Sequence, residues 1–577
     1  MMNVVIVGGG ISGISAAKVV LKAGHHATII ESTAAPGGLM ARIANCRVGF
    51  STCYDEIRMH PHLTVINGGS ITAVEKKGEV FFITLDNGQC VAGDRVVIAA
   101  GLTPYDPIEY KGRKVLTSLE YDALIDQAKA DLPADFNRIA FVLCVGSRSE
   151  EYPLCSSVCC SYTIREIKWT LQRAKPDITI FYNDLRLFGQ EFYMEKIYRD
   201  AGLRFVRANS RYFDQEGEEV KVRYFTGGKL VEEVFDYVVL AIGLRPNPTL
   251  GQLSRLFGFS LNEWGFVKEE GALRTDVKGV YAAGGALEPM SIKDSILTGF
   301  GAGFMAAREG ADPAERDERL YREEAPEIAI ADGTFDSCLF YLGTEDPGAR
   351  MFYEFISSKF IAAALRLRKA GKTVYVLDRN MSVPSYGELA YIEARREGVL
   401  FVHLEEGEDV VFEGGMAVVK GQARELAFTV DKIVRFDDYM DAFKDREFLS
   451  VYRSEPQLRW SPTKWGRKKY HVGFIRHPRA ERWEARELLG ALGEMRLDEE
   501  EERVFPEVDE ERCSGCGSCK DACPHSAIEM EFRQTAIALF GPDTTAAVPI
   551  AHVQKDTCVG CGLCASTCPS DVITYTP

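Results

Sequence analysis

The sequence has no long hydrophobic run, no excess of basic residues and no recognisable export signal. No apolar stretch approaches the roughly 18 residues that a membrane-spanning helix needs, so we expect no transmembrane segment. The formal net charge of −16 argues against a nucleic-acid-binding surface, which is normally basic. The apolar start at residues 2–7 has neither a basic flank nor a cleavage site. We therefore interpret it as a first strand and predict a cytoplasmic protein.

Cysteine is the residue type whose distribution most needs an explanation. The chain has 577 residues and 16 cysteines, and twelve of these fall in three tight groups. In a chain without an export signal, such groups favour metal ligation over disulfide bonds. The other four are scattered, and we interpret them as buried thiols: Cys46, Cys53, Cys90 and Cys338.

The N-terminal segment has the pattern of a dinucleotide-binding strand–turn–helix–strand unit. An apolar strand at residues 4–7 runs into a glycine-rich turn, where Gly8 would make the tight turn and Gly10 would let a pyrophosphate approach the backbone. Gly13 would let the helix pack closely on the strand. Glu31 ends the second strand, where its carboxylate would accept a hydrogen bond from a ribose hydroxyl.

Two further features favour FAD over NAD as the bound dinucleotide. Pro36-Gly37-Gly38 follows Glu31, as in flavoprotein loops that pass the isoalloxazine ring, and apolar strands end in glycine at 95–101, 237–243 and 279–284. These strands resemble the returning segments of two-dinucleotide-domain flavoproteins of the thioredoxin reductase type. That family usually has Asp after the last glycine, where this chain has Gly285. The predicted FAD contacts are Gly8, Gly10, Ser12, Gly13, Glu31, Gly38, Leu39, Ala100, Gly101, Gly284 and Gly285.

Cysteines occupy the place where such reductases bind NAD(P)H. The strand at 139–143 is followed by Cys144-Val145-Gly146-Ser147-Arg148, and one glycine cannot supply both the tight turn and the close backbone approach. Cys155, Cys159 and Cys160 come shortly afterwards. Four thiolates this close in sequence suit a [4Fe–4S] cluster. From the spacing alone, a zinc site and unligated thiols remain open.

These motifs, together with the segment 184–189, resemble the A-type (FAD and iron–sulfur) subunit family of heterodisulfide reductase, which includes flavin subunits of quinone-interacting oxidoreductases. The resemblance covers residues 1–310 and the C-terminal module. It implies that Cys144, Cys155, Cys159 and Cys160 ligate one [4Fe–4S] cluster near the flavin, and that the domain takes no hydride from NAD(P)H. The chain departs from the longest family members, because it has no extension before Gly8 and no ferredoxin insertion inside the flavin domain.

The resemblance also implies partners and a setting. Such subunits sit in large anaerobic hetero-oligomers, often where flavin-based electron bifurcation takes place. The implied partners are other redox subunits, namely iron–sulfur or heterodisulfide-reductase-like proteins, ferredoxin, or hydrogenase or dehydrogenase modules.

The middle of the chain repeats the cluster-bearing region faintly, beyond a charged linker at 309–327. Three pairs of segments are similar at offsets of 195 to 197 residues: 179–183 with 374–378, 201–206 with 397–402, and 144–146 with 341–343. We predict a second, degenerate α/β unit that lacks cluster cysteines and a GxGxxG turn. Its expected role is structural or partner docking, and an unrecognised ligand site is the alternative. A basic run at 464–482 would dock an acidic partner or form a solvated surface.

The C-terminal region carries two runs of the form C-x2-C-x2-C-x3-C-P, the spacing of bacterial two-cluster ferredoxins. The fourth cysteine of each run ligates the other cluster. One predicted ligand set is therefore Cys513, Cys516, Cys519 and Cys568, and the other is Cys558, Cys561, Cys564 and Cys523. Zinc is the alternative, although its sites rarely use this doubled spacing. The connection between the runs exceeds that of a minimal ferredoxin, so we expect extra structure there.

Together these patterns predict an α/β protein of three parts. A thioredoxin-reductase-like FAD domain spans 1–310, with a cluster-bearing subdomain at 139–240 in place of the NAD(P)H domain. A degenerate α/β repeat spans 328–495, and a 2[4Fe–4S] ferredoxin domain spans 503–577. With FAD and three [4Fe–4S] clusters, we predict an FAD-dependent oxidoreductase subunit that exchanges electrons with protein partners, and we assign no catalytic residue. The alternatives are an NAD(P)H-dependent flavin reductase and a passive electron-wire or scaffold subunit.

Overall fold

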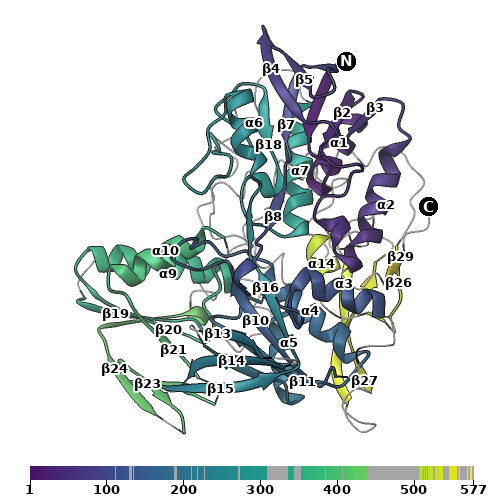
Figure 1. Cartoon of the computed structure of the whole chain (residues 1–577). Helices are drawn as coiled ribbons and strands as arrows, with labels where there is room; N and C mark the ends of the chain where they lie inside the picture. Colours follow the sequence, from purple (N-terminus) through teal and green to yellow (C-terminus); the bar gives the residue numbers. More distant parts are fainter. Residues whose placement is uncertain are drawn as a thin grey trace.

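A computed structural model describes most of the chain (Figure 1). Residues 1–307 are described apart from short gaps at 111, 129–132, 134, 188–190, 209–210, 217–218, 227 and 271–272. Residues 335–343 and 353–438 follow, without 384, 406 and 423. The described C-terminal residues are 506–510, 512–513, 515, 517–523, 527–536, 545–554, 558, 564, 568 and 572–574. The predicted linker at 309–327, the basic run at 464–482 and the boundaries at 310, 328, 495 and 503 lie outside the described residues.

The first part of the chain forms a five-stranded parallel sheet in the order β18-β7-β1-β2-β3. Four of its strands, β1, β2, β7 and β18, are largely apolar and buried, as expected of a parallel sheet covered on both faces, whereas the edge strand β3 is only partly buried. Helices α1 (Ile11–Lys22) and α7 (Ile292–Ala306) pack together beside it. The strands are β1 (Asn3–Val7), β2 (His26–Glu31), β3 (Leu63–Asn67), β7 (Arg95–Ile98) and β18 (Val280–Ala282).

Smaller elements complete this FAD-type domain. Strands β4 (Ile71–Lys77), β5 (Val80–Leu85) and β6 (Cys90–Gly93) form an antiparallel sheet. Helices α2 (Arg47–Arg58) and α6 (Thr249–Phe257) pack against α1 and β4, respectively. The antiparallel pair β8 (Leu102–Pro104) and β17 (Leu244–Pro246) joins this domain to the next unit.

The cluster-bearing unit is a second five-stranded parallel sheet, in the order β12-β11-β10-β16-β9. It also includes β9 and α3, which lie before residue 139, where the sequence predicts that the cluster-bearing subdomain begins. The strand that ends at Gly243, β16, lies in this sheet and not in the FAD-domain sheet. The elements of this unit are β9 (Val115–Thr117), α3 (Ser118–Ala128), β10 (Arg138–Val145), α4 (Cys159–Leu171), β11 (Asp177–Tyr182), α5 (Glu191–Asp200), β12 (Arg204–Arg207) and β16 (Tyr237–Ile242). An antiparallel sheet precedes β16 in the chain and consists of β13 (Arg211–Glu216), β14 (Glu219–Thr226) and β15 (Lys229–Phe235).

The middle of the chain repeats this topology. Its parallel sheet has the order β21-β20-β19-β25, which matches β12-β11-β10-β16 strand for strand, and an antiparallel three-stranded sheet again precedes the last strand. The second α/β unit of the predicted fold class is thus present. Its elements are β19 (Ser337–Tyr341), α9 (Tyr353–Lys369), β20 (Thr373–Asp378), α10 (Gly387–Arg396), β21 (Leu400–His403), β22 (Asp409–Glu413), β23 (Met416–Lys420), β24 (Glu425–Thr429) and β25 (Lys432–Arg435).

The C-terminal module (Figure 1, yellow) is small and contacts α4 of the cluster-bearing unit through the hydrogen bond from Arg165 to Ser518. Strands β26 (Glu507–Val508) and β29 (Ile573–Thr574) pair its two ends, and helix α14 (Ser518–Ala522) lies in its first half. A hairpin of β27 (Ile528–Ala536) and β28 (Thr545–Val553) separates the two cysteine runs, where the sequence predicts extra structure. Within the described residues, no helix is long and apolar enough to cross a membrane.

Candidate functional site

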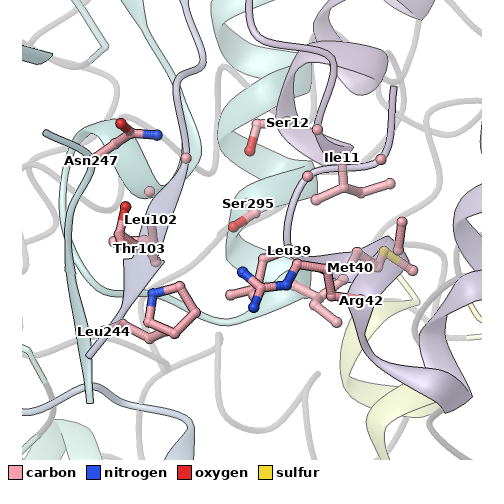
Figure 2. Close-up of a pocket in the computed structure, with 18 of the residues that line it drawn as sticks. Ile11, Ser12, Leu39, Met40, Arg42, Leu102, Thr103, Leu244, Asn247 and Ser295 are labelled. Carbon is pink, nitrogen blue, oxygen red and sulfur yellow. The ribbon is translucent and has the colours of Figure 1, made fainter. Parts of the chain in front are cut away.

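A cavity of about 940 Å³ lies between the first sheet and the cluster-bearing unit (Figure 2). Most of the residues predicted to contact FAD line it: Gly8, Gly10, Ser12, Glu31, Gly38, Leu39, Ala100, Gly101 and Gly285. Gly13 and Gly284 do not. These two glycines allow close packing instead. A Cβ on Gly13 would lie 2.0 Å from the Gly8 carbonyl oxygen, and a Cβ on Gly284 would lie 1.9 Å from Ser12 Oγ.

The glycine turn has the geometry that a bound pyrophosphate requires. Gly8 has φ +112°, and a Cβ there would lie 2.3 Å from the carbonyl oxygen of Ala99, so only glycine fits. Helix α1 starts directly after Gly10, and no side chain caps its N-terminus. Its first N–H groups and the positive end of its dipole therefore face the cavity, which is the usual arrangement for binding phosphate.

Glu31 is fixed at the cavity wall. Its carboxylate is only 6% exposed and accepts hydrogen bonds from the Gly9 N–H (2.8 Å), the Thr33 N–H (2.7 Å) and the Thr33 hydroxyl (2.8 Å). Oε2, which accepts from Gly9, keeps an unused lone pair. The carboxylate is thus held rigidly with capacity to accept from a sugar hydroxyl.

The missing Asp at position 285 has a steric explanation. A Cβ on Gly285 would lie 2.4 Å from Leu102 Cγ and 3.0 Å from the Gly101 carbonyl carbon. Leu102 therefore occupies the space that the Asp side chain of thioredoxin-reductase-type proteins would need. The sequence shows the departure at Gly285, but only the structure shows which residue replaces the side chain.

The rest of the cavity wall comes from residues that the sequence analysis did not select. Figure 2 shows Arg42 and Met40 on one side and Thr103, Leu244 and Asn247 on the other. The Asn247 amide donates to the carbonyl oxygen of Ala100 (2.7 Å), which fixes the returning glycine segment. No local motif marks these positions, because each reaches the cavity only through the tertiary fold.

The four clustered cysteines lie near one another, and one of them, Cys159, is at the edge of this cavity. Cys144 is near the end of β10 with φ +64°, and α4 begins at Cys159 and Cys160. Cys155, Cys159 and Cys160 are buried, and Cys144 is half-buried. Cys159 lines the cavity itself. The structure thus brings all four predicted ligands together beside the flavin site.

The surroundings of these thiols suit an anionic group. The Ser157 N–H donates to Cys155 Sγ (3.4 Å), the Arg186 N–H donates to Cys160 Sγ (3.5 Å), and the α4 N-terminus adds its positive dipole end. Hydrogen bonds of this kind to sulfur tune cluster potentials.

The ferredoxin cysteines share one small core. Cys519, Cys558, Cys564 and Cys568 are buried in it, with Cys513 and Cys523 partly buried against it. The Ala551 N–H donates to Cys513 Sγ (3.5 Å), and the Ala527 N–H donates to Cys523 Sγ (3.2 Å). Six of the eight predicted ligands are therefore gathered, and Cys516 and Cys561 lie outside the described residues.

The ferredoxin module reaches the flavin cavity. Ser518, the first residue of α14, lines the cavity and accepts a hydrogen bond from the Arg165 guanidinium on α4. Because Ser518 lies between Cys513 and Cys519, a ferredoxin cluster site adjoins the cavity as well. Helix α4 thus bears the cluster cysteines at its N-terminus and the ferredoxin contact one turn later.

The α3–α4 wall of the cavity carries two buried carboxyl groups. Burial raises the pKa of Glu166 well above its usual value, and the nearby Asp122 adds to the shift. Burial also raises the pKa of Asp122, although the hydrogen bond that its carboxylate accepts from the Ala44 N–H (2.7 Å) lowers it in part. Within the described residues, neither oxygen of Glu166 has a hydrogen-bond partner. The surroundings of Glu166 therefore favour its protonated form.

Two family models match the chain. The pyridine nucleotide-disulphide oxidoreductase model matches residues 2–128 and 166–299, and the 4Fe-4S dicluster domain model matches residues 512–572. The first match is interrupted over the segment that holds Cys144, Cys155, Cys159 and Cys160. The FAD-dependent oxidoreductase class and the ferredoxin-type C-terminus are thereby confirmed, together with the thioredoxin-reductase-like fold.

Several curated relatives carry heterodisulfide reductase names, which confirms the resemblance seen in the motifs. The A-type subunit of the H(2):CoB-CoM heterodisulfide,ferredoxin reductase of Methanothermobacter thermautotrophicus is 32% identical over 241 residues, covering 37% of this chain and 36% of the relative. One of the A-type iron-sulfur subunits of the CoB--CoM heterodisulfide reductase of Methanopyrus kandleri is 30% identical, and the match covers 41% of this chain and 40% of the relative. The matches therefore span well under half the length of these relatives.

The solved structures give a weaker likeness. Thioredoxin reductase of T. acidophilum is 20% identical with a TM-score of 0.40, covering 53% of this chain and 98% of that one. Lactococcus lactis thioredoxin reductase is 17% identical with a TM-score of 0.39, and the match covers 52% of this chain and 95% of that one.

Proposed function

We propose that this chain, a relative of the A-type subunits of heterodisulfide reductase, is the FAD and iron–sulfur electron-transfer subunit of a cytoplasmic redox complex of that type. One observation carries the proposal: the flavin cavity is lined both by Cys159 of the cluster-bearing unit and by Ser518 of the ferredoxin module. The flavin site therefore has two different one-electron outlets. Such a junction is what electron bifurcation requires, and we include bifurcation in the proposal.

The proposed cofactors are one FAD and three [4Fe–4S] clusters. Cys144, Cys155, Cys159 and Cys160 would hold the cluster next to the flavin, and the two ferredoxin runs would hold the others with exchanged fourth ligands. A bound FAD accepts electrons in pairs and releases them singly, whereas clusters carry one at a time. The chain itself supplies the buried N–H donors, the α1 N-terminus and the Glu31 carboxylate that would position these groups.

Electrons would enter through protein partners and not from NAD(P)H. The tight turn after β10 contains one glycine, Gly146, and the ring of Tyr105 covers its open side: a Cβ on Gly146 would lie 2.2 Å from that ring. A pyrophosphate has no comparable approach to the backbone at this turn. The interruption of the family match over the same segment agrees with this.

Reduction experiments on anaerobically purified holoprotein test this proposal. NADH and NADPH should leave the flavin absorbance unchanged over minutes, whereas a low-potential reduced ferredoxin should bleach it and reduce the clusters. Rapid bleaching by NADH would establish the flavin-reductase alternative instead. A flavin that stays oxidised while all clusters become reduced would establish a passive wire.

Metal analysis tests the cofactor assignment. Three cubanes correspond to about 12 iron atoms per chain. In Cys523→Ser, the cluster of Cys558, Cys561 and Cys564 should lose its fourth ligand, while the FAD content stays at the wild-type level because the flavin domain has its own core. About eight irons in fully loaded wild-type protein would remove the cluster at Cys144, Cys155, Cys159 and Cys160.

A further inference from the structure

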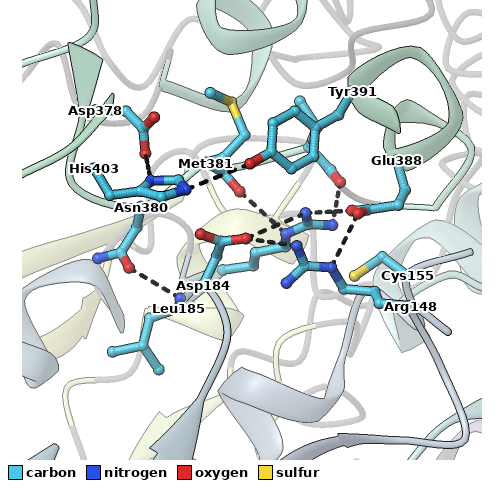
Figure 3. Close-up of polar contacts among 12 residues, drawn as sticks. Arg148, Cys155, Asp184, Leu185, Asp378, Asn380, Met381, Glu388, Tyr391 and His403 are labelled. Atoms are coloured by element: carbon cyan, nitrogen blue, oxygen red, sulfur yellow. Dashed lines mark hydrogen bonds and ion pairs between the residues drawn. The ribbon is translucent and has the colours of Figure 1, made fainter. Parts of the chain in front are cut away.

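The second α/β unit covers the cluster-binding loops directly (Figure 3). In the connection between β20 and α10, Asn380, Met381 and Val383 contact the loop after β11. The Leu185 N–H donates to Asn380 Oδ1 (3.0 Å), and Arg186 donates to the carbonyl oxygens of Met381 (3.1 Å) and Val383 (2.5 Å). The same connection also reaches a predicted ligand, because the Cys155 N–H donates to the carbonyl oxygen of Ser385 (3.5 Å).

Four charged side chains form a closed network at this junction. Arg148 pairs with Asp184 (2.5 Å) and with Glu388 (3.1 Å), and Arg186 pairs with Glu388 and lies 4.0 Å from Asp184. All four side chains are at most 7% exposed. Three come from the cluster-bearing unit, and Glu388 comes from the second unit.

The two arginines lie next to the cluster cysteines. Arg148 is four residues after Cys144, and the backbone N–H of Arg186 donates to Cys160 Sγ (3.5 Å). Burial alone would lower the pKa of Arg148, but Glu388, Asp184 and the thiolates of Cys144 and Cys155 raise it well above its usual value. The guanidinium charges are thus permanent and lie close enough to the cysteines to interact electrostatically with Cys155.

We propose that the second α/β unit sets the reduction potential of the cluster at Cys144, Cys155, Cys159 and Cys160, with Glu388 as the positioning residue that balances Arg148 and Arg186. This inference rests on the cluster assignment made under the proposed function. It gives the second unit, which has no cluster cysteines of its own, a direct part in electron transfer.

The charge balance predicts the direction of each effect. Two guanidinium and two carboxylate groups cancel, so the intact network adds little net charge beside the cluster. A cluster gains one negative charge when it is reduced, and nearby positive charge favours that state. In a buried site such charges are weakly screened. Removing the negative charge of Glu388 should therefore raise the potential, and removing the positive charge of Arg148 should lower it.

The neighbouring Asp184, Asp378 and His403 do not form a second metal site in this interpretation. Burial would raise the pKa of Asp184, yet Arg148 and Arg186 lower it to about 2, so its charge is already compensated by cations. His403 Nδ1 lies 2.9 Å from Asp378 Oδ1 and compensates that carboxylate. A divalent cation here would face the two guanidinium groups at short range.

The test is a potentiometric titration of the holoprotein, monitored by electron paramagnetic resonance, on Glu388→Gln and Arg148→Gln. The midpoint potential of the near-flavin cluster should become more positive in the first variant and more negative in the second. Glu388→Asp should restore the wild-type value. The matched control is Glu393→Gln, on the same helix, which is half-exposed and paired with Lys369; it should shift nothing. The ferredoxin clusters should titrate alike in every variant.

Iron and FAD counts on each protein separate the possible failures. If the wild type holds only two clusters, the cluster assignment itself fails. If three clusters are present and the two Gln variants shift the potential in the same direction, or not at all, the charge-balance inference is wrong. Should Glu388→Gln lose the cluster, Arg148→Gln decides alone: a lower potential supports the inference and an unchanged one contradicts it.

Discussion

The cluster-bearing unit and the second α/β unit share a topology and differ in what their loops carry. Strand order β12-β11-β10-β16 in one corresponds to β21-β20-β19-β25 in the other, and each has an antiparallel three-stranded sheet before its last strand. At the end of β10, the first unit presents Cys144 and the turn at Gly146, whereas the equivalent positions at the end of β19 are Tyr341 and Gly343. Parallel sheets of this kind place their chemistry in the loops at the carboxyl ends of strands, so the scaffold can persist where a cofactor site is absent.

The two units meet through equivalent loops. Leu185 and Arg186 follow β11, and they bond to Asn380 and Met381, which follow β20. The loop that lies beside the clustered cysteines in one unit is thus contacted by the equivalent loop of the other. A unit without such a cysteine group forms part of the wall around these cysteines.

The largest difference between the units should appear on removing a buried cysteine from each. Cys159→Ser should cost the near-flavin cluster, about four of about 12 iron atoms, and leave the ferredoxin signals intact. Cys338→Ala, in the core of β19, should cost no iron, because burial raises the pKa of this thiol to about 12 and keeps it protonated. Iron analysis with spectroscopy measures both. Equal iron content in Cys159→Ser and wild type would contradict the near-flavin cluster.

A smaller difference should appear at the equivalent glycines. Gly146 has φ +73° and faces the ring of Tyr105, whose hydroxyl is held by Glu109, so Gly146→Ala should lower the free energy of unfolding by about 1–3 kcal/mol. Gly343 has no positive φ, so alanine there adds no backbone strain, although its Cβ would lie 2.0 Å from Tyr341 Oη and displace that side chain. Gly343→Ala should therefore cost less than Gly146→Ala. Urea unfolding midpoints measure both, and equal losses would mean that the two turns are under equal constraint.

The unpartnered Glu166 should give the cluster-bearing unit a pH dependence. A carboxyl with a raised pKa holds its proton more tightly in the folded chain. Its contribution to stability is therefore complete below the unfolded pKa near 4.3 and is lost as the pH rises to the folded pKa.

The substitution that tests this is Glu166→Gln, which removes the ionisable carboxyl group and keeps the size and shape of the side chain. Above the unfolded pKa near 4.3, the stability of the variant relative to wild type should rise with pH by up to about 1.4 kcal/mol per pH unit, until the folded pKa is reached. Urea unfolding at a series of pH values measures this difference. A flat difference would contradict the raised pKa of Glu166.

The smallest effects should come from the outer sheets of the two units. Phe225 on β14 is 51% exposed and Met416 on β23 is 38% exposed. Replacing either by Thr should change the free energy of unfolding by no more than about 0.5 kcal/mol, as is usual at exposed positions. A larger loss for Phe225→Thr, measured by urea unfolding of the holoprotein, would show that the two outer sheets are not equivalent.

Local spacing is what made the sites predictable from the sequence. Gly8, Gly10 and the cysteine runs lie in short segments whose spacing reflects the geometry of one turn or one cluster. The duplicate unit was predictable because its strands recur at a nearly constant offset. Asn247 and Arg42 escaped prediction because they reach the cavity only through the tertiary fold. The pairing of Arg148 with Glu388 escaped for the same reason, since nothing in either segment marks the other as its partner.

The packing of α1 against α7 gives the assembly of the protein a time order. Gly299 and Gly303 bring the helices so close that a Cβ would lie 2.4 Å from the Ser12 carbonyl oxygen or 2.5 Å from that of Ala16. The second helix begins roughly 270 residues after the first ends, which at about 5–20 residues per second is about 15–55 s of synthesis. During that interval residues 115–242 are synthesised while the nucleotide fold still lacks α7. The nucleotide fold therefore closes only after the unit from β9 to β16 has been made.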